Sequence, residues 1–119
     1  MSEDKRGGRD WRLHLDDMMA FAGKVEAYTT GMEQADFIAD GRTYDATLRN
    51  LELIGEAASR IPETVRADHV EIPWRQIIAT RNRLIHGYLG IDDDTIWSVI
   101  QDDIPVLLAA LESLARRIR

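Results

Sequence analysis

Apolar residues recur at steps of three or four along most of this chain, which is the spacing that gives an α-helix one apolar face. The strict alternation that is typical of β-strands is nearly absent. Helices are expected over residues 10–28, 32–39, 43–60, 73–85 and 92–118. These stretches predict an all-α fold, an antiparallel up-and-down bundle of four to five helices with short connections.

Glycine and proline set the expected ends of these helices. Gly31 closes the first stretch, and Pro62 ends the third because proline cannot continue the hydrogen-bond ladder of a helix. Pro73 suits the first turn of the next helix, and the segment between the two prolines has room for one short helical turn. Asp92 is the expected N-cap of the last helix, in which Pro105 predicts a kink.

The apolar stripes of these helices predict one core. Its candidates are Leu15, Met18, Phe21, Ala22, Val25, Tyr28, Leu48, Leu51, Ile54, Ala58, Ile61, Trp74, Ile77, Ile78, Leu84, Ile96, Ile100, Ile104, Leu107, Leu111, Leu114 and Ile118. His14 and His69 have no partner at a useful spacing, so both are expected on the surface. The 119 residues fit one domain, with a flexible lead over residues 1–9 and a helical domain over residues 10–119.

Composition excludes several kinds of site. The chain has no cysteine, which excludes disulfides and thiolate zinc sites. No apolar run approaches the ~20 residues needed to span a bilayer, and the charged N-terminus lacks the apolar region of a secretory signal. A cytoplasmic protein without a membrane partner is therefore expected. The net charge of -6 argues against non-specific coating of nucleic acid but permits one basic cleft.

Arg81, His86 and Tyr88 stand close together between two predicted helices. Histidine is the side chain best suited to exchange a proton near neutral pH, and arginine binds phosphate oxygens with a permanent charge. The pair suits metal-independent cleavage of RNA, in which the ribose 2′-hydroxyl attacks the neighbouring phosphate. His86 would act as general acid or base, and Arg81 would stabilise the negative charge of the transition state.

The geometry of one straight helix does not bring this pair together. At 3.6 residues per turn, His86 lies about 140° around the helix from Arg81. The two meet on one ligand only where the backbone bends or a second subunit completes the site. Arg75, Asn82 and Arg83 are further candidates for phosphate contacts. Ordinary roles also remain open, with His86 capping a helix end and Arg81 in a surface ion pair.

The motif and the segments around it resemble one known family. In that family an arginine is followed by four residues, a histidine, one residue and a tyrosine, as in Arg81-Asn-Arg-Leu-Ile-His86-Gly-Tyr88. The other resembling segments are Arg49–Ala57, Ile72–Ile78, Gly90–Asp92, Ile96–Trp97 and Asp103–Pro105. Together they cover about residues 10 to 115 in order. The chain resembles the HepT-like branch of the HEPN superfamily, ribonuclease toxins paired with a minimal nucleotidyltransferase antitoxin.

The resemblance implies a HEPN helical bundle that forms a homodimer, with two motifs facing each other across a cleft. It implies an RNA endonuclease with Arg81 and His86 as catalytic residues, Asn82 in support, and neither cofactor nor metal. It further implies the toxin of a type VII-like toxin-antitoxin pair, neutralised when the antitoxin transfers AMP from ATP to Tyr88. The alternative is a non-catalytic helical dimer that serves as binding partner or substrate of a nucleotidyltransferase.

Carboxylates offer other candidate sites. Glu52 and Glu56 are one helical turn apart and suit a metal or a proton transfer, although solvated carboxylates are the simpler interpretation. Because Glu56 belongs to one of the resembling segments, it is also a candidate for orienting Arg81. The run Asp92–Asp94 suits magnesium, but capping of a helix is the favoured interpretation.

Overall fold

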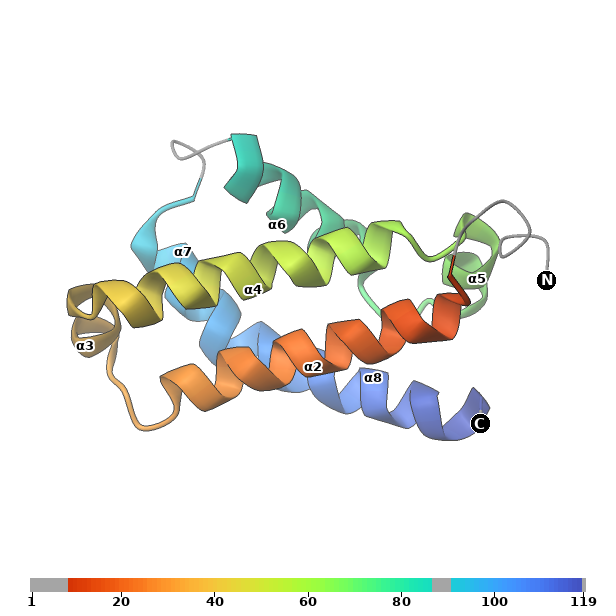
Figure 1. Ribbon diagram of the computed structural model, residues 1–119, viewed down its shortest axis with the longest axis horizontal. Coiled ribbons are helices and arrows are strands. Elements are labelled where there is room, and N and C mark those ends of the chain that lie inside the picture. The colour runs from red at the N-terminus through yellow and green to blue at the C-terminus, as the bar shows by residue number, and fades with distance from the viewer. Residues whose placement is uncertain (1–8, 87–90, 119) are drawn as a thin grey trace.

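Four long helices form an antiparallel up-and-down bundle, in which each runs opposite to the one before it (Figure 1). The computed structural model describes residues 9–86 and 91–118. The long helices are α2 (Trp11–Thr29), α4 (Gly41–Ser59), α6 (Trp74–His86) and α8 (Ile104–Ile118). These described residues contain no strand, so the prediction of an all-α bundle is confirmed.

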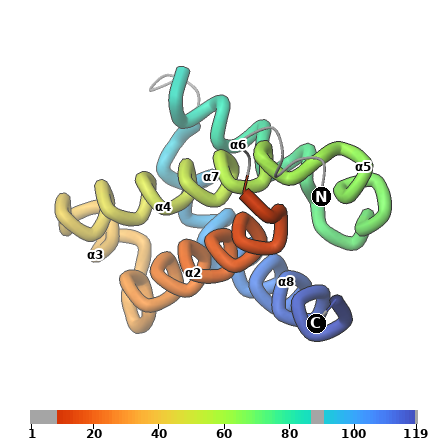
Figure 2. The backbone as a smooth tube through the Cα atoms, turned by 45° about the vertical axis from the view of Figure 1, so that its right-hand side comes forward, coloured from red at the N-terminus to blue at the C-terminus, as the bar shows by residue number. Residues whose placement is uncertain are grey.

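Short helices lie between the long ones. They are α3 (Gln34–Ala39), α5 (Glu63–Asp68) and α7 (Asp93–Ser98). Figure 2 shows α3 and α5 at opposite ends of α4, so both cap the bundle rather than extend its layers. The helix α5 lies in the stretch between Pro62 and Pro73 where a single turn was expected.

Aspartates cap three helix N-termini. The carboxylates of Asp10, Asp40 and Asp92 accept backbone N–H groups in the first turns of α2, α4 and α7, at 3.0, 3.2 and 2.7 Å. These hydrogen bonds favour the ionised form and lower the pKa of each carboxyl below its ordinary value. The prediction of Asp92 as an N-cap is confirmed. Beyond α2, Gly31 has a φ of 82°, which favours glycine.

The helix expected over residues 92–118 is not one regular helix. A π-helical segment, η1 (Val99–Asp103), separates α7 from α8. Pro105 lacks the N–H that would bond to the carbonyl of Gln101, and its ring crowds that carbonyl. The wider π turn gives the ring room without ending the helix. The disturbance predicted at Pro105 is therefore a π segment directly before the proline.

The core lies among α2, α4, η1 and α8. Its buried members include Leu15, Met18, Ala22, Val25, Leu51, Ile54, Ala58, Ile61, Ile96, Ile100, Ile104, Leu107, Leu111 and Leu114, all of them predicted. Two expectations about α2 are wrong. Tyr28 is 39% exposed at the end of its helix, and His14, expected on the surface, is only 7% exposed.

The helix α6 packs on α4 but makes little contact with α8. Of its residues only Trp74 is buried. Ile77, Ile78 and Leu84, which were expected in the core, are half-buried because the helix is covered mainly on its α4 side. Figure 1 shows the C-terminal end of α6 rising away from the bundle. The helix that carries Arg81 and His86 is therefore the most exposed of the long helices.

Candidate active site

Arg81 lies where α6 approaches α4 most closely. A Cβ atom at Gly55 would stand 2.2 Å from the Cβ of Arg81 and 3.1 Å from the carbonyl oxygen of Ile77. Real Cβ atoms do not approach other atoms so closely, so only glycine permits this crossing of the two helices. Gly55 thereby lets the backbone of α6 pack close to α4 at Arg81, which sets where the Arg81 side chain lies relative to α4.

Gly55 was not among the residues predicted to build the site. The signal was present, because glycine inside a helix costs about 1 kcal/mol relative to alanine and suggests a packing or functional reason for its presence. Gly55 also belongs to Arg49–Ala57, one of the segments that resemble the family.

Among the described residues, one nitrogen of the Arg81 guanidinium donates to a neighbouring side chain and another is buried without a partner. Its Nη1 donates to Oδ1 of Asn82 at 3.0 Å. Its Nε is buried and has no hydrogen-bond partner among residues 9–86 and 91–118. A buried N–H group without a partner costs about 1–3 kcal/mol, so such groups are rare and call for a ligand or a water to complete them.

The contact between Arg81 and Asn82 changes the geometric problem of the motif. Asn82 and His86 are four residues apart in α6, so they lie on the same face of the helix. Arg81 starts on the side that meets α4, and its hydrogen bond turns the guanidinium toward the face of Asn82 and His86. The described residues show no hydrogen bond from Arg81 to His86 itself. One chain therefore brings Arg81 and Asn82 together and leaves His86 separate.

His86 is exposed and is the last residue of α6. Its ring is open to solvent and to any second chain or ligand that approaches this end of α6. Tyr88, predicted as the site of modification, lies outside the described residues.

A wide groove runs beside this face of α6. It has a volume of about 1120 Å³ and lies between α5 and α6, with Arg66, Arg75 and Asn82 among its lining residues. Arg75 and Asn82 are seven residues apart on one side of the helix, so the groove leads along α6 toward His86. Its cations and its direction suit a nucleic-acid strand that ends at the motif.

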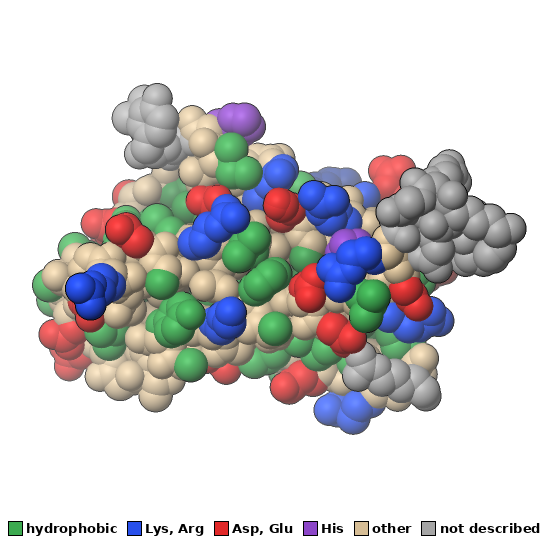
Figure 3. Space-filling view, viewed as in Figure 1, with side chains coloured by type: hydrophobic (Ala, Val, Ile, Leu, Met, Phe, Trp, Pro, Cys, Tyr) green, Lys and Arg blue, Asp and Glu red, His purple; other side chains and the backbone are tan. Residues whose placement is uncertain are grey.

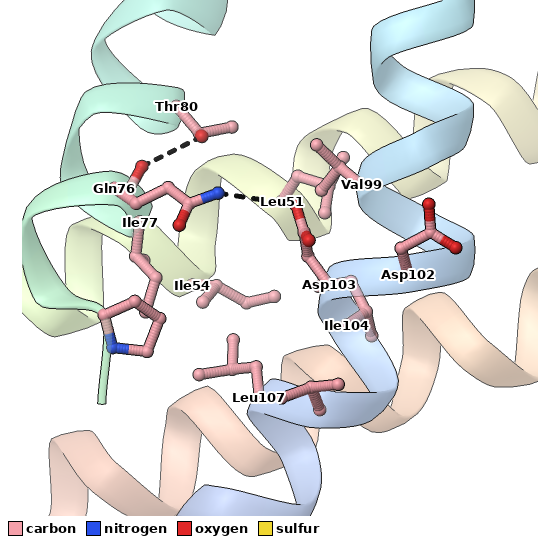
Figure 4. A pocket seen from close by; sticks show the side chains of 12 residues that line it. Leu51, Ile54, Gln76, Ile77, Thr80, Val99, Asp102, Asp103, Ile104 and Leu107 are labelled. Atoms are coloured by element: carbon pink, nitrogen blue, oxygen red, sulfur yellow. Dashed lines mark hydrogen bonds between the residues drawn. The ribbon is translucent and has the colours of Figure 1, made fainter. Parts of the chain in front are cut away.

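A second groove opens on the other side of α6 (Figure 4). It has a volume of about 210 Å³, and side chains of α4, α6 and α8 form an apolar floor that includes Ile54, Ile77 and Leu107. Asp103 stands at its rim and accepts from Nε2 of Gln76 at 3.5 Å. Burial and the charge of Asp102 raise the pKa of Asp103. This acidic rim does not suit an RNA strand.

The two other predicted carboxylates, on α4, do not orient Arg81. Glu52 pairs with Arg49 at 3.3 Å. No ion pair or hydrogen bond joins Glu56 to Arg81 among the described residues, so Asn82 rather than Glu56 holds the guanidinium.

Two of the three aspartates in the run 92–94 accept side-chain hydrogen bonds. Oδ1 of Asp93 accepts from the Tyr44 hydroxyl at 2.6 Å, and Oδ1 of Asp94 accepts from Nε2 of Gln34 at 2.6 Å. The hydrogen bond to Asp93, followed by burial, raises the pKa of Tyr44 to about 12. Together with the cap at Asp92, these contacts tie the start of α7 to α3 and α4.

Comparison with known proteins identifies the family. The model of the family described as "Ribonuclease HepT-like" matches residues 18–114. The chain belongs to the HepT-like ribonuclease family. The resemblance inferred from the motif and its flanking segments is thereby confirmed, and with it the assignment to a family of ribonucleases.

Relatives match the HepT-like chain over nearly its whole length. It is 37% identical over 112 residues to "Probable ribonuclease HepT" of Thermococcus cleftensis, covering 94% of this chain and 99% of that one. It is 32% identical over 110 residues to "Putative RNase MJ1216" of Methanocaldococcus jannaschii, covering 92% and 91%. No solved structure matches the chain significantly. None of the described helices combines the length and apolar character needed to cross a membrane.

Proposed function

We propose that the chain is a metal-independent endoribonuclease whose catalytic residues are Arg81 and His86. The observation that carries the proposal is the position and hydrogen bonding of the Arg81 side chain. Gly55 fixes its position, Asn82 turns its guanidinium toward the face of His86, and its buried Nε has no partner among the described residues. A phosphate oxygen is a suitable partner for that N–H group. Membership of a ribonuclease family supports the same chemistry.

In the proposed reaction the ribose 2′-oxygen attacks the adjoining phosphorus. A bond from the 2′-oxygen to phosphorus forms as the bond to the 5′-oxygen breaks, which leaves a 2′,3′-cyclic phosphate and a 5′-hydroxyl. One imidazole accepts the proton of the 2′-hydroxyl, and one donates a proton to the leaving 5′-oxygen. Arg81 stabilises the additional charge on the phosphate oxygens, and Asn82 positions its guanidinium.

A homodimer would complete this site. The face of α6 that carries Asn82 and His86 is exposed, as is Ile85 at 45%, and it is free to meet the same face of a second copy. A two-fold axis near the end of α6 would then place two copies of His86 in one cleft. One would accept and the other would donate the proton, and the separation of Arg81 from His86 within one chain would no longer matter.

The resemblance supports a proposal for regulation. The chain would be the toxin of a type VII-like pair in the cytoplasm, neutralised by a minimal nucleotidyltransferase antitoxin that transfers AMP to Tyr88. Tyr88 is two residues beyond His86, so the added phosphate would bring negative charge next to the catalytic pair and repel RNA. The alternative is a non-catalytic helical dimer that is only a substrate or partner of that transferase. Such a scaffold has no need of both Arg81 and His86.

The products of purified protein test the proposal. Wild-type chain in EDTA should cleave RNA and leave 2′,3′-cyclic phosphate and 5′-hydroxyl ends, whereas Arg81→Ala and His86→Ala should not. Arg12→Ala is a matched control, because Arg12 is an exposed arginine on α2. Cleavage that requires a metal, or that persists in both variants, contradicts the mechanism. Mass spectrometry after co-expression with a nucleotidyltransferase tests Tyr88, where an unmodified tyrosine in a neutralised toxin contradicts the proposed switch.

A further inference from the structure

A pocket between α2 and α4 takes no part in the mechanism above. It has a volume of about 240 Å³. Its lining combines two arginines, a histidine, two carboxylates and an apolar floor, namely Arg9, His14, Asp17, Phe21, Leu53, Glu56, Ala57 and Arg60. A small apolar floor with a few convergent polar groups is the usual make-up of a ligand site.

His14 is the unusual member of this pocket. It is only 7% exposed, and its ring makes no hydrogen bond with any residue in 9–86 or 91–118. Burial, followed by the charge of Arg9 and then that of Arg60, lowers the pKa of His14, against an opposite effect of Asp17. The lowered pKa favours the neutral ring, which presents one donor and one acceptor.

The charged groups around His14 are not all paired. Arg9 donates to Oδ2 of Asp17 at 2.7 Å, which leaves little net charge on that side. Neither Glu56 nor Arg60 forms an ion pair within the described part of the chain. The α4 side of the pocket thus offers a guanidinium and a carboxylate that are both available to a ligand. Figure 3 shows basic and acidic side chains interspersed over this face of the molecule, so binding here would depend on local contacts.

The pocket is close to the candidate active site along α4. Glu56 lines the pocket, and its neighbour Gly55 carries the close contact with Arg81. The pocket and the Arg81 contact therefore lie on different sides of the same turn of one helix. An α-helix with its side chains is about 10–12 Å across. A strand bound at Arg81 would have to pass around α4, by about the width of one helix, to reach the pocket.

We propose that this pocket binds one nucleotide of the RNA strand near the cleaved bond, and so sets base preference. Arg60 would bind its phosphate, Phe21 and Leu53 would contact the base, and His14 with Glu56 would bind the base edge. A carboxylate accepts from an exocyclic amino group, which adenine, cytosine and guanine have and uracil lacks. The pocket would therefore favour an amino-bearing base over uridine. The inference rests on the proposed ribonuclease function.

Cleavage profiles test the preference. An RNA with a fixed cleavage site and randomised flanking positions should be cut with uridine disfavoured at one of them. Glu56→Gln, which adds a donor where only an acceptor stood, should abolish that bias and lower kcat/KM about tenfold. A dinucleotide, too short to reach the pocket, should be cut by the variant at the wild-type rate. Arg42→Gln, an exposed arginine in the first turn of α4, is the control and should preserve the profile.

Binding separates failure of this inference from failure of the proposed function. On a His86→Ala background, a fluorescent 2′-O-methyl RNA with cytidine at the preferred position should bind about tenfold more tightly than its uridine counterpart. Glu56→Gln should remove that difference, whereas His14→Phe, which removes the hydrogen bonds of the imidazole but keeps a ring, should weaken the binding of both RNAs. If RNA binding shows the cytidine preference but the wild-type protein does not cleave RNA, the ribonuclease proposal is overturned and the pocket stands. An unchanged cleavage profile in Glu56→Gln, together with unchanged RNA binding in Glu56→Gln and His14→Phe, would overturn the pocket. A loss of cleavage by Glu56→Gln on the dinucleotide as large as its loss on the longer RNA would also overturn it.

Discussion

The helices α2 and α6 meet the rest of the molecule in opposite ways. α2 buries Leu15, Met18, Ala22 and Val25 completely and packs on both α4 and α8. α6 buries only Trp74 and packs mainly on α4. The first helix holds the fold together, and the second presents the candidate site. Elements that move or bind ligands are commonly those with few buried contacts. The contrast predicts that stability and activity can be changed separately.

The largest expected effects are those at the two extremes, His86 and Met18. His86→Ala should lower activity by about 10²–10⁴-fold, because a general acid or base is lost. Its free energy of unfolding should stay within about 0.5 kcal/mol of wild type, since the side chain is exposed. Met18→Ala should lower the free energy of unfolding by about 2–5 kcal/mol, because it opens a cavity in a fully buried position.

Urea unfolding and single-turnover cleavage, each at a temperature where the protein is folded, measure both quantities. Met18→Ala should cleave at close to the wild-type rate once its folded fraction is taken into account. A marked loss of stability in His86→Ala would show that the end of α6 contributes to the fold, and the separation between the two helices would be wrong.

The next effect concerns Gly55, where the two regions meet. Gly55→Ala should destabilise by about 1–3 kcal/mol, because its Cβ must push α6 away from α4. The same displacement should move Arg81 and lower cleavage at least tenfold, because small misplacements of a catalytic group are costly. Gly23→Ala in α2 is the matched control. Its Cβ meets nothing within 4 Å, so the higher helix propensity of alanine should stabilise by up to about 1 kcal/mol.

Thermal melts and cleavage assays of the two alanine variants decide this point. If both alanine variants change stability and cleavage only slightly, α4 and α6 can move apart at little cost in free energy. In that case the position of Arg81 would need another explanation.

The same glycine illustrates what sequence reasoning reached and what it missed. Periodicity alone located the helices, since their apolar stripes had to face one core, and proline and aspartate marked their ends. It did not show that α6 would be covered mainly by α4, because Ile77, Ile78 and Leu84 form an apolar stripe like those of the fully packed helices. The packing of Arg81 against Gly55 and the burial of His14 depend on which helices are neighbours in the fold. Neither can be derived from the spacing of residues within one helix.

The smallest effect concerns Tyr44 of α4, whose hydroxyl donates a hydrogen bond to Asp93 of α7. Tyr44→Phe removes the hydrogen bond to Asp93 and should cost about 1 kcal/mol. The pKa of Tyr44 is raised from 10.0 to about 12 in the folded chain. Between those values the unfolded chain has lost the proton that the folded chain keeps, so this contribution is full below pH 10 and falls as pH rises toward 12. Urea unfolding should show that decline in wild type and a weaker one in Tyr44→Phe. Parallel curves would mean that Asp93 does not hold the Tyr44 proton.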